Sequence, residues 1–382
     1  MQAGALRASS RTATSLTVHA SRLSRTPLVT CRQASFFGLA TSSSRFRSAL
    51  LTAPLSSRLF HSSPAAMTMT KTPPAQLPGS ALLRKNLRIA CIQLASGADK
   101  AANLAHARDK VLEAAKLGAG LVVLPECFNS PYGCDYFPSY AEPLLPSPPT
   151  KEASPSFHAL SAMAQEAGVY LVGGSIPESV ETKDAVRDDG KTYYNTSLTF
   201  GPDGALLATH RKVHLFDIDI PGKIKFKESD VLSPGNKVTI VDLPPYGKIA
   251  VAICYDVRFP ELATVAARQG CFALIYPGAF NTTTGPLHWR LQGQARAMDN
   301  QVYVAFCSPA RDLNASYHAW GHSLVVDPMA KVLVEADEKE TIVTADLDAD
   351  TIESTRSSIP LRDQRRFDVY PDVSAGKVRY EE

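Results

Sequence analysis

The sequence predicts an α/β protein of the α-β-β-α type, in which two stacked β-sheets carry helices on their outer faces. The first observation is that short apolar, strand-like runs alternate with helical stretches between residues 87 and 349. The second is that pairs of consecutive strands interrupt this alternation, which argues against a single doubly wound sheet. The third is the composition, because 382 residues with 45% hydrophobic and 20% charged residues can fill one large globular domain.

The individual elements follow from apolar periodicity and from the turn residues between them. Two strands are expected to form a hairpin around Asp327 and Pro328. The other expected strands cover 87–94, 121–124, 169–173, 193–200, 205–213, 238–243, 248–253, 273–276 and 302–307. Expected helices cover 100–117, 154–167, 261–268 and 285–299.

The first 66 residues differ in composition from the rest of the chain. They contain eight arginines and no Asp, Glu or Lys, and the first acidic residue of the whole sequence is Asp99. This composition is typical of a mitochondrial transit peptide, and a disordered basic tail is the alternative. We therefore expect localisation in the mitochondrial matrix. Translation that starts at Met67 or Met69 would produce an additional, cytoplasmic form.

The remaining chain divides into three parts. A linker rich in Pro, Thr and Ala covers 67–86, a globular domain covers 87–349, and 350–382 is a C-terminal extension that is a candidate for contact with a second subunit. Without residues 1–66, 32 basic residues stand against 37 acidic ones, so we expect no nucleic-acid partner. No apolar run approaches the roughly 18 residues of a membrane span, so no membrane insertion is expected.

Cysteine usage points to a reactive thiol rather than to a metal site. The seven cysteines show no C-x-x-C spacing, which argues against a disulfide framework and against a zinc site. Residues 249–253 read as a buried strand, Cys254 follows directly, and a helix is expected after Pro260. A strand-to-helix turn exposes its side chain, and a helix N-terminus or a nearby cation would lower the thiol pKa. The alternative is a buried structural cysteine.

Two further residues are candidates for the same site. Glu126 follows a fully apolar strand, where burial would raise its pKa toward that of a general base, and a structural salt bridge is the alternative. Lys212 lies in 211–216, where basic and apolar residues alternate as in a strand and place Lys212, His214 and Phe216 on one face. Opposite a buried Glu and Cys, the ammonium group of Lys212 could stabilise a thiolate or an oxyanion.

The chain resembles the nitrilase superfamily of carbon–nitrogen hydrolases over about residues 87–370. The resemblance rests on three separated motifs, which are Leu124-Pro125-Glu126, Arg211-Lys212-Val213-His214-Leu215-Phe216-Asp217 and Ile253-Cys254-Tyr255-Asp256-Val257-Arg258-Phe259-Pro260-Glu261. Four more segments resemble the omega-amidase branch of that superfamily, and they cover 216–223, 277–289, 299–305 and 308–312.

This resemblance implies a four-layer sandwich and an amide hydrolase that needs no cofactor and no metal. It implies that Cys254 attacks the amide carbonyl to form a thioester, with Glu126 as general base and acid. Lys212 and the backbone N–H of Tyr255 would then stabilise the oxyanion. Glu228 matches a second glutamate near the site in this family and would position Lys212 or the substrate, with a surface glutamate beside two lysines as the alternative.

For an omega-amidase the implied substrates are α-ketoglutaramate and α-ketosuccinamate, which give 2-oxoglutarate or oxaloacetate plus ammonia. Arg258, four residues after the nucleophile, is the candidate for binding the distal carboxylate. Structural pairing of Arg258 with Asp256 or Glu261 is the alternative. Phe280 and Thr284 are candidates for the pocket wall, and core packing is the alternative for Phe280.

Two other functions compete with this interpretation. The nearest is an amidase of deaminated glutathione, from the sister branch of the same superfamily. The other is a non-catalytic interaction protein with a nitrilase fold. The presence of Glu126, Lys212 and Cys254 argues against this alternative. The resemblance also implies a homodimer formed through helices beside the nucleophile.

Overall fold

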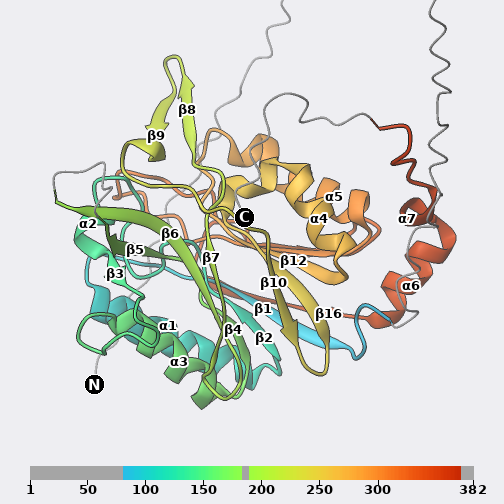
Figure 1. Ribbon diagram of the computed structural model, residues 1–382, viewed down its shortest axis with the longest axis horizontal. Helices are drawn as coiled ribbons and strands as arrows, with labels where there is room; N and C mark the ends of the chain where they lie inside the picture. The colour runs from blue at the N-terminus through green and yellow to red at the C-terminus, as the bar shows by residue number, and fades with distance from the viewer. Residues whose placement is uncertain (1–80, 183–188, 371–382) are drawn as a thin grey trace, which may run out of the picture. The chain divides into compact units, whose positions relative to one another are not determined.

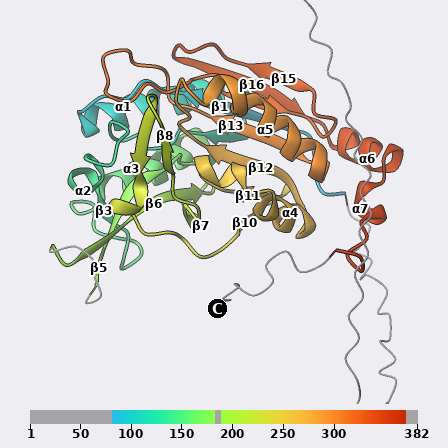
Figure 2. The ribbon, with the colours of Figure 1, turned by 90° about the horizontal axis from the view of Figure 1, so that it is seen from above.

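The computed structural model describes residues 81–182 and 189–370. Within this part, two β-sheets are stacked face to face, as Figures 1 and 2 show. Helices α1 (Lys100–Lys116) and α3 (Pro155–Ala167) cover the outer face of one sheet. Helices α4 (Pro260–Arg268) and α5 (Gly285–Asn300) cover the outer face of the other. The fold is the predicted α-β-β-α sandwich.

The first sheet has eight strands, in the order β16-β1-β2-β4-β6-β5-β3, with β7 paired to β6. The strands are β1 (Leu87–Gln93), β2 (Leu121–Val123), β3 (Glu142–Pro143), β4 (Tyr170–Val172), β5 (Ile176–Glu181), β6 (Lys191–Phe200), β7 (Leu206–Arg211) and β16 (Thr341–Leu347). Strand β1 lies between β2, which is parallel to it, and β16, which is antiparallel. The first and last strands of the domain are therefore neighbours.

The second sheet has six strands in sequence order. They are β10 (Thr239–Leu243), β11 (Gly247–Val251), β12 (Cys271–Pro277), β13 (Tyr303–Cys307), β14 (Leu324–Val326) and β15 (Val332–Glu335). The central strands β11, β12 and β13 are parallel, and α4 and α5 are the crossovers that connect them. Parallel strands covered on both faces form nearly continuous apolar runs, which is why the sequence predicted these three strands directly.

Several elements of the structure were not predicted. The strands among them are β3, β5, β16 and the separate hairpin of β8 (Asp217–Ile220) with β9 (Ile224–Lys227). The helices among them are α2 (Phe137–Tyr140), α6 (Ala349–Ser358) and α7 (Leu361–Gln364). Prolines, charged residues or very short length hide the apolar pattern in these segments, so local periodicity is a weak signal there.

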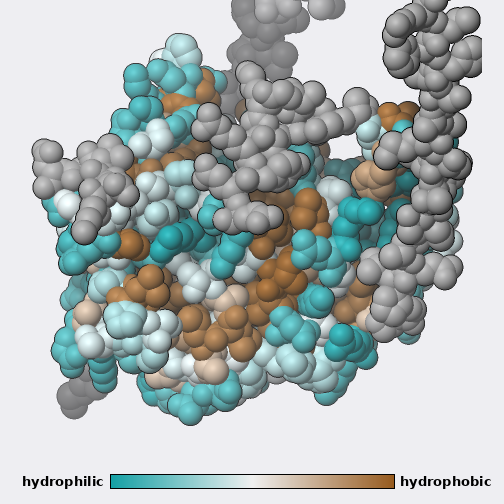
Figure 3. All heavy atoms as spheres, viewed as in Figure 1, coloured by the Kyte–Doolittle hydropathy of each residue, from teal (hydrophilic) through white to brown (hydrophobic). Residues whose placement is uncertain are grey.

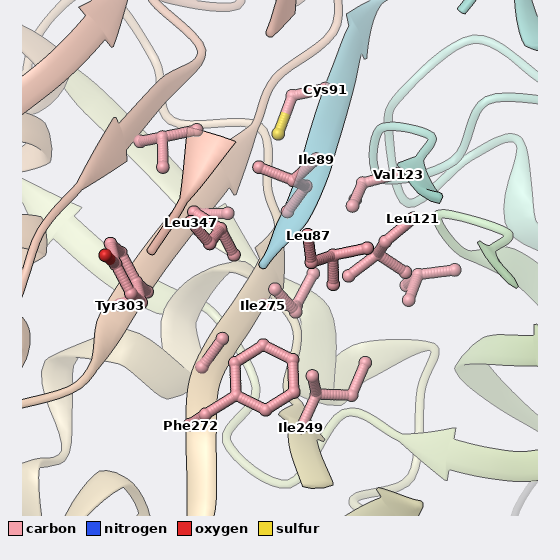
Figure 4. Close-up of a cluster of buried hydrophobic side chains, with 14 of the residues drawn as sticks. Leu87, Ile89, Cys91, Leu121, Val123, Ile249, Phe272, Ile275, Tyr303 and Leu347 are labelled. Carbon is pink, nitrogen blue, oxygen red and sulfur yellow. The ribbon is translucent and has the colours of Figure 1, made fainter. Parts of the chain in front are cut away.

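The core between the two sheets follows from strand alternation. In β1, Ile89 and Cys91 point into a central cluster shared by both sheets, whereas Ala90 and Ile92 pack under α1 and α3. Figure 4 shows this central cluster, in which side chains from both sheets approach one another. The double-sided burial of β1 fixes its register against β2 and β16, because a shift by one residue would exchange its two faces.

The packed domain extends beyond the predicted boundaries on both sides. Leu83, which falls in the predicted linker 67–86, is buried in the central cluster, and the N–H of Arg84 donates to the carbonyl of Tyr246. Ile352 of α6, in the predicted extension, is buried in the same cluster. Burial of leucine and isoleucine side chains holds both segments on the domain. The predicted leader 1–66 lies outside the described residues.

The surface of the domain is mixed in hydropathy. On the face shown in Figure 3, hydrophobic residues form separate patches among hydrophilic ones. None of the helices that the structure describes combines the length and the hydropathy that crossing a membrane requires.

Candidate active site

Cys254 lies on a strained turn between β11 and α4. One turn of 3-10 helix (Cys254–Arg258) separates the strand from the α-helix, so the predicted strand-to-helix turn is longer than expected. The φ angle of Cys254 is 48°, in the left-handed region that residues other than glycine seldom occupy. Gly278 makes room for this turn, because a Cβ at position 278 would lie 3.0 Å from the Cα of Cys254.

Asp256 anchors this turn to the segment that carries Lys212. Its buried carboxylate accepts hydrogen bonds from the backbone N–H of Ile253 at 2.9 Å and of His214 at 2.8 Å. The rings of His210 and His214 also bond to it, at 3.2 and 2.8 Å. Burial alone would raise the pKa of Asp256, but the two histidines and the backbone donors hold it well below its usual value. From the sequence, Asp256 was expected only as an alternative partner of Arg258, and its role in anchoring this turn was not predicted.

Glu126 lies three residues after the end of β2 and is almost completely buried. One carboxylate oxygen accepts from the amide of Asn195 at 2.8 Å and from the ammonium of Lys212 at 3.1 Å. The other accepts from the backbone N–H of Ala279 at 2.8 Å, and the carboxylate interacts with the thiol of Cys254. Burial raises the pKa of Glu126, and the charge of Lys212 offsets only part of that effect. The direction is the one expected for a general base.

Lys212 is fully buried between two carboxylates. Its Nζ lies 3.1 Å from Glu126 and 2.9 Å from Glu228. Burial alone would lower the pKa of Lys212, but the two glutamates outweigh it and the pKa is raised, so the side chain stays charged. The predicted strand alternation over 211–216 is wrong, because β7 ends at Arg211 and residues 212–216 form no strand.

The thiol of Cys254 has the opposite pKa shift to the expected one. Burial and the nearby charge of Glu126 raise its pKa well above the usual value, and the charge of Lys212 offsets only part of this. The expected lowering by a helix N-terminus fails because the thiol is enclosed beside a carboxylate. At neutral pH the sulfur therefore holds its proton, and Glu126 is the group placed to accept it.

Glu228 lies against Lys212, so the alternative of a surface glutamate is excluded. It is the first residue of a 3-10 helix (Glu228–Asp230) that follows β9, and it is fully buried. The oxygen that accepts from Lys212 also accepts from the hydroxyl of Tyr132 at 3.0 Å. The other oxygen accepts from the backbone N–H of Phe216 at 2.8 Å. These contacts hold Lys212 in place from the side opposite Glu126.

Arg258 has no carboxylate partner among the described residues, so the alternative of pairing with Asp256 or Glu261 is not realised. Its Nη1 lies 3.1 Å from Nδ1 of His288, and its buried Nε has no hydrogen-bond partner. The guanidinium lies over the ring of Phe280, at 4.7 Å from the centroid, and near that of Tyr255 at 5.3 Å. This cation, which has no carboxylate partner among the described residues, ends the same 3-10 helix that Cys254 begins.

The other predicted pocket residues are held in different ways. Phe280 packs on Trp289, with ring centroids 4.9 Å apart, so it belongs to the core as well as to the surroundings of Arg258. The backbone N–H and the hydroxyl of Thr284 bond to the side-chain oxygen of Asn281 at 2.9 and 3.3 Å. The ring of Tyr255 packs near Phe216. The expectation that the backbone N–H of Tyr255 donates to the oxyanion stays a prediction.

Two aromatic side chains and one amide of the site were not predicted from the sequence. Tyr132 and Tyr317 lie with ring centroids 4.5 Å apart, and both line a cavity of about 190 Å³ that reaches Glu126. Asn195 lies on β6 and bonds Glu126 directly. The sequence offered no specific signal for Asn195, because β6 carries several other polar residues. Within residues 81–182 and 189–370, no group of three or more His, Cys, Asp or Glu has the arrangement of a metal site.

Comparisons with known proteins agree with this fold. Residues 88–357 match the carbon–nitrogen hydrolase family. The omega-amidase NIT3 of Saccharomyces cerevisiae is 53% identical over 302 residues, which cover 78% of this chain and 100% of that protein. The omega-amidase NIT2 of Mus musculus is 53% identical over 283 residues, covering 74% of this chain and 96% of the mouse protein. The crystal structure of S. cerevisiae Nit3, a member of branch 10 of the nitrilase superfamily, is similar with a TM-score of 0.66 at 50% identity. It covers 75% of this chain and 99% of the yeast chain.

The sandwich and its buried Cys, Glu and Lys define a hydrolase that acts on the carbon–nitrogen bonds of amides. The chain belongs to the carbon–nitrogen hydrolase family, within the nitrilase superfamily.

Proposed function

We propose that this hydrolase is an omega-amidase, which removes the terminal amide of α-ketoglutaramate and α-ketosuccinamate and releases ammonia. The observation that carries the proposal is the guanidinium of Arg258, which lies near Cys254 and has no carboxylate partner among the described residues. A partly buried cation of this kind is suited to bind the carboxylate of a keto-acid amide. The names of the yeast and mouse relatives support the same substrate class.

The acylation step uses the three buried side chains. Glu126 takes the proton from the thiol of Cys254 as the sulfur attacks the amide carbon, which gives a tetrahedral oxyanion. The ammonium of Lys212 and the backbone N–H of Tyr255 stabilise this negative charge. Glu126 then passes its proton to the amide nitrogen, the carbon–nitrogen bond breaks, and ammonia leaves behind a thioester.

The deacylation step reverses these roles. Glu126 removes a proton from a water molecule, whose oxygen attacks the thioester carbon. The carbon–sulfur bond breaks, the thiolate recovers a proton, and the product is the dicarboxylate 2-oxoglutarate or oxaloacetate. Because the raised pKa of Glu126 makes it a stronger base than an ordinary carboxylate, the same group can serve both steps.

The decisive experiment measures ammonia release by the protein lacking residues 1–66. The substrates are α-ketoglutaramate and deaminated glutathione at equal concentration, with Cys254→Ala as the inactive control. We expect a preference for α-ketoglutaramate of about tenfold or more, which Cys254→Ala abolishes. A preference for deaminated glutathione would assign the protein to the sister branch. Absence of turnover with both would support the interaction-protein alternative.

The expected thioester has its own test. Mass spectrometry of the enzyme quenched during turnover should show an acyl adduct on Cys254. Its absence in a Glu126→Gln variant that still binds substrate would show that Glu126 is needed before the thioester forms. An adduct on any other residue would contradict the assignment of Cys254.

Mitochondrial targeting by residues 1–66 is part of the proposal. The absence of acidic residues and the eight arginines support it. A fluorescent reporter fused after residue 66 should enter mitochondria, and replacing the arginines with glutamine should leave it in the cytoplasm.

A further inference from the structure

The guanidinium of Arg258 is held by one polar partner only. Among the described residues it forms no ion pair, and its single hydrogen bond joins Nη1 to Nδ1 of His288. Its planar group lies over the ring of Phe280 and near that of Tyr255. Flexible arginine side chains lose much rotamer freedom when they are fixed, so the direction in which this one points depends on His288.

We propose that His288 is the positioning residue that orients Arg258 toward the distal carboxylate of the substrate. This inference rests on the proposed function, because it assumes that Arg258 binds that carboxylate. His288 itself need not touch the substrate. It acts by fixing one arm of the guanidinium, which leaves the remaining N–H groups directed at the ligand.

The contact with Arg258 determines the protonation state of the His288 ring. A guanidinium has only donors, so Nδ1 of His288 must be the acceptor, and the ring must be neutral. Burial and the charge of Arg258 lower the pKa of His288, which keeps the ring neutral at physiological pH. A neutral acceptor suits this task better than a carboxylate, because a carboxylate would neutralise Arg258 and compete with the substrate.

The position of His288 on the fold makes the contact rigid. The residue lies in the first turn of α5, next to Trp289, which is buried and donates its ring N–H to the carbonyl of His322 at 2.7 Å. The backbone N–H of His288 donates to the carbonyl of Thr284 at 2.9 Å. A side chain on a packed helix holds its partner more firmly than one on a loop.

The test compares two substrates and two substitutions. His288→Leu removes the acceptor, whereas His288→Asn keeps an oxygen near the position of Nδ1. The substrates are α-ketoglutaramate and pentanamide, an uncharged amide of the same chain length. We expect His288→Leu to raise the KM for α-ketoglutaramate about tenfold with kcat within about twofold of wild type. The kcat/KM for pentanamide should stay unchanged, and His288→Asn should recover most of the lost affinity.

A double variant and a remote control complete the test. Because His288 acts through Arg258, adding His288→Leu to Arg258→Ala should not raise KM further. His158→Leu, on α3 over the other sheet, should leave the KM for both substrates unchanged. Equal KM increases for both substrates, failure of His288→Asn to recover affinity, or additive effects in the double variant would overturn the proposal.

The outcomes also separate this inference from the proposed function. The proposed role of Arg258 in binding the substrate carboxylate is wrong if the wild type does not hydrolyse α-ketoglutaramate, or if Arg258→Ala leaves its KM unchanged. In either case the inference about His288 is wrong as well. If Arg258→Ala raises KM and His288→Leu does not, only the role of His288 is wrong.

Discussion

At the scale of single residues, the site depends on how buried charges balance one another. The carboxylates of Glu126 and Glu228 lie on two sides of the ammonium of Lys212, and water reaches none of the three. Charges in such an environment are costly unless each has a partner. The protonated thiol of Cys254 leaves this cluster with one negative charge in excess, which favours Glu126 as the acceptor of the thiol proton.

Replacing Lys212 by methionine should therefore affect both stability and activity. Lys212→Met leaves two buried carboxylates without a cation, so we expect a loss of about 3–5 kcal/mol in the free energy of unfolding. The kcat should fall at least about 10²-fold, because the oxyanion loses its cationic partner. Urea denaturation and ammonia release measure the two effects.

The double variant Lys212→Met/Glu228→Gln serves as the control. Removing one negative charge together with the positive one should recover part of the stability but none of the activity. If Lys212→Met is as stable as the wild type, the cluster does not have the charge balance that its geometry indicates.

The lowered pKa of Asp256 predicts how the stability of the protein depends on pH. Its pKa in the folded protein lies well below the unfolded value near 4, because the histidines and backbone donors outweigh burial. A depressed folded pKa contributes stability that is fully present above the unfolded pKa and is lost as the pH falls through the folded pKa. Wild-type stability should thus decline below about pH 4.

The variant Asp256→Asn isolates this contribution. At pH 7 we expect it to be less stable by about 2 kcal/mol or more, because two histidines and three backbone N–H donors lose a charged acceptor. Below pH 4 its deficit relative to wild type should shrink. A deficit that stays constant from pH 7 to pH 3 in chemical denaturation would contradict the assigned pKa shift.

At the scale of elements, the three proposed catalytic side chains all lie within three residues of the end of a strand. Glu126 follows β2, Lys212 follows β7 and Cys254 follows β11. Turns after strands can adopt backbone conformations that strands cannot, and this freedom brings the three groups together. The cost is strain, as at Cys254, and tight packing between turns.

Gly174, just after β4, shows how tight that packing is. Its φ is +58°, and a Cβ there would lie only 2.0 Å from the carbonyl oxygen of Pro125, the residue before Glu126. We expect Gly174→Ala to destabilise the protein by about 3 kcal/mol or more and to lower kcat by displacing Glu126.

Gly168 provides a matched control for this substitution. Its φ is +65°, but no atom lies within 4 Å of the position of an added Cβ. Gly168→Ala should therefore cost only the conformational term of about 1 kcal/mol and leave kcat unchanged. Thermal unfolding and initial rates of both variants measure the difference, and equal losses would show that no clash occurs at Gly174.

At the scale of the whole molecule, one outer helix carries apolar residues that nothing in the described part of the chain covers. Leu287, Leu291 and Met298 of α5 are 66%, 63% and 53% exposed. Their spacing of four and seven residues places them on one face of the helix. An exposed apolar stripe of this kind is typical of an interface between subunits.

We expect this face of α5 to be the homodimer interface. The double substitution Leu287→Asp/Leu291→Asp should halve the mass measured by light scattering at micromolar concentration, because it places two charges in an apolar interface. Leu117→Asp, at the exposed end of α1 on the opposite outer layer, should leave the mass unchanged. A monomeric wild type, or a dimeric double variant, would contradict this expectation.

The sequence alone predicted the sandwich, because strands such as β11, β12 and β13 are apolar on both faces and helices such as α1 show clear periodicity. It also identified Glu126, Lys212, Cys254 and Glu228 as candidates, since each belongs to a short motif in the chain. Unpredicted elements such as β16 depend on pairing with β1, more than 200 residues earlier in the chain.

Other features were decided only by the tertiary structure. The pKa shift of Cys254 was wrongly predicted because it depends on enclosure beside Glu126, which no local segment encodes. The role of Asp256 depends on His210 and His214, which come from another part of the chain. Arg258 likewise acquires His288 as its partner from α5. Sequence determines which groups are available, whereas burial and long-range packing determine how each is charged and where it points.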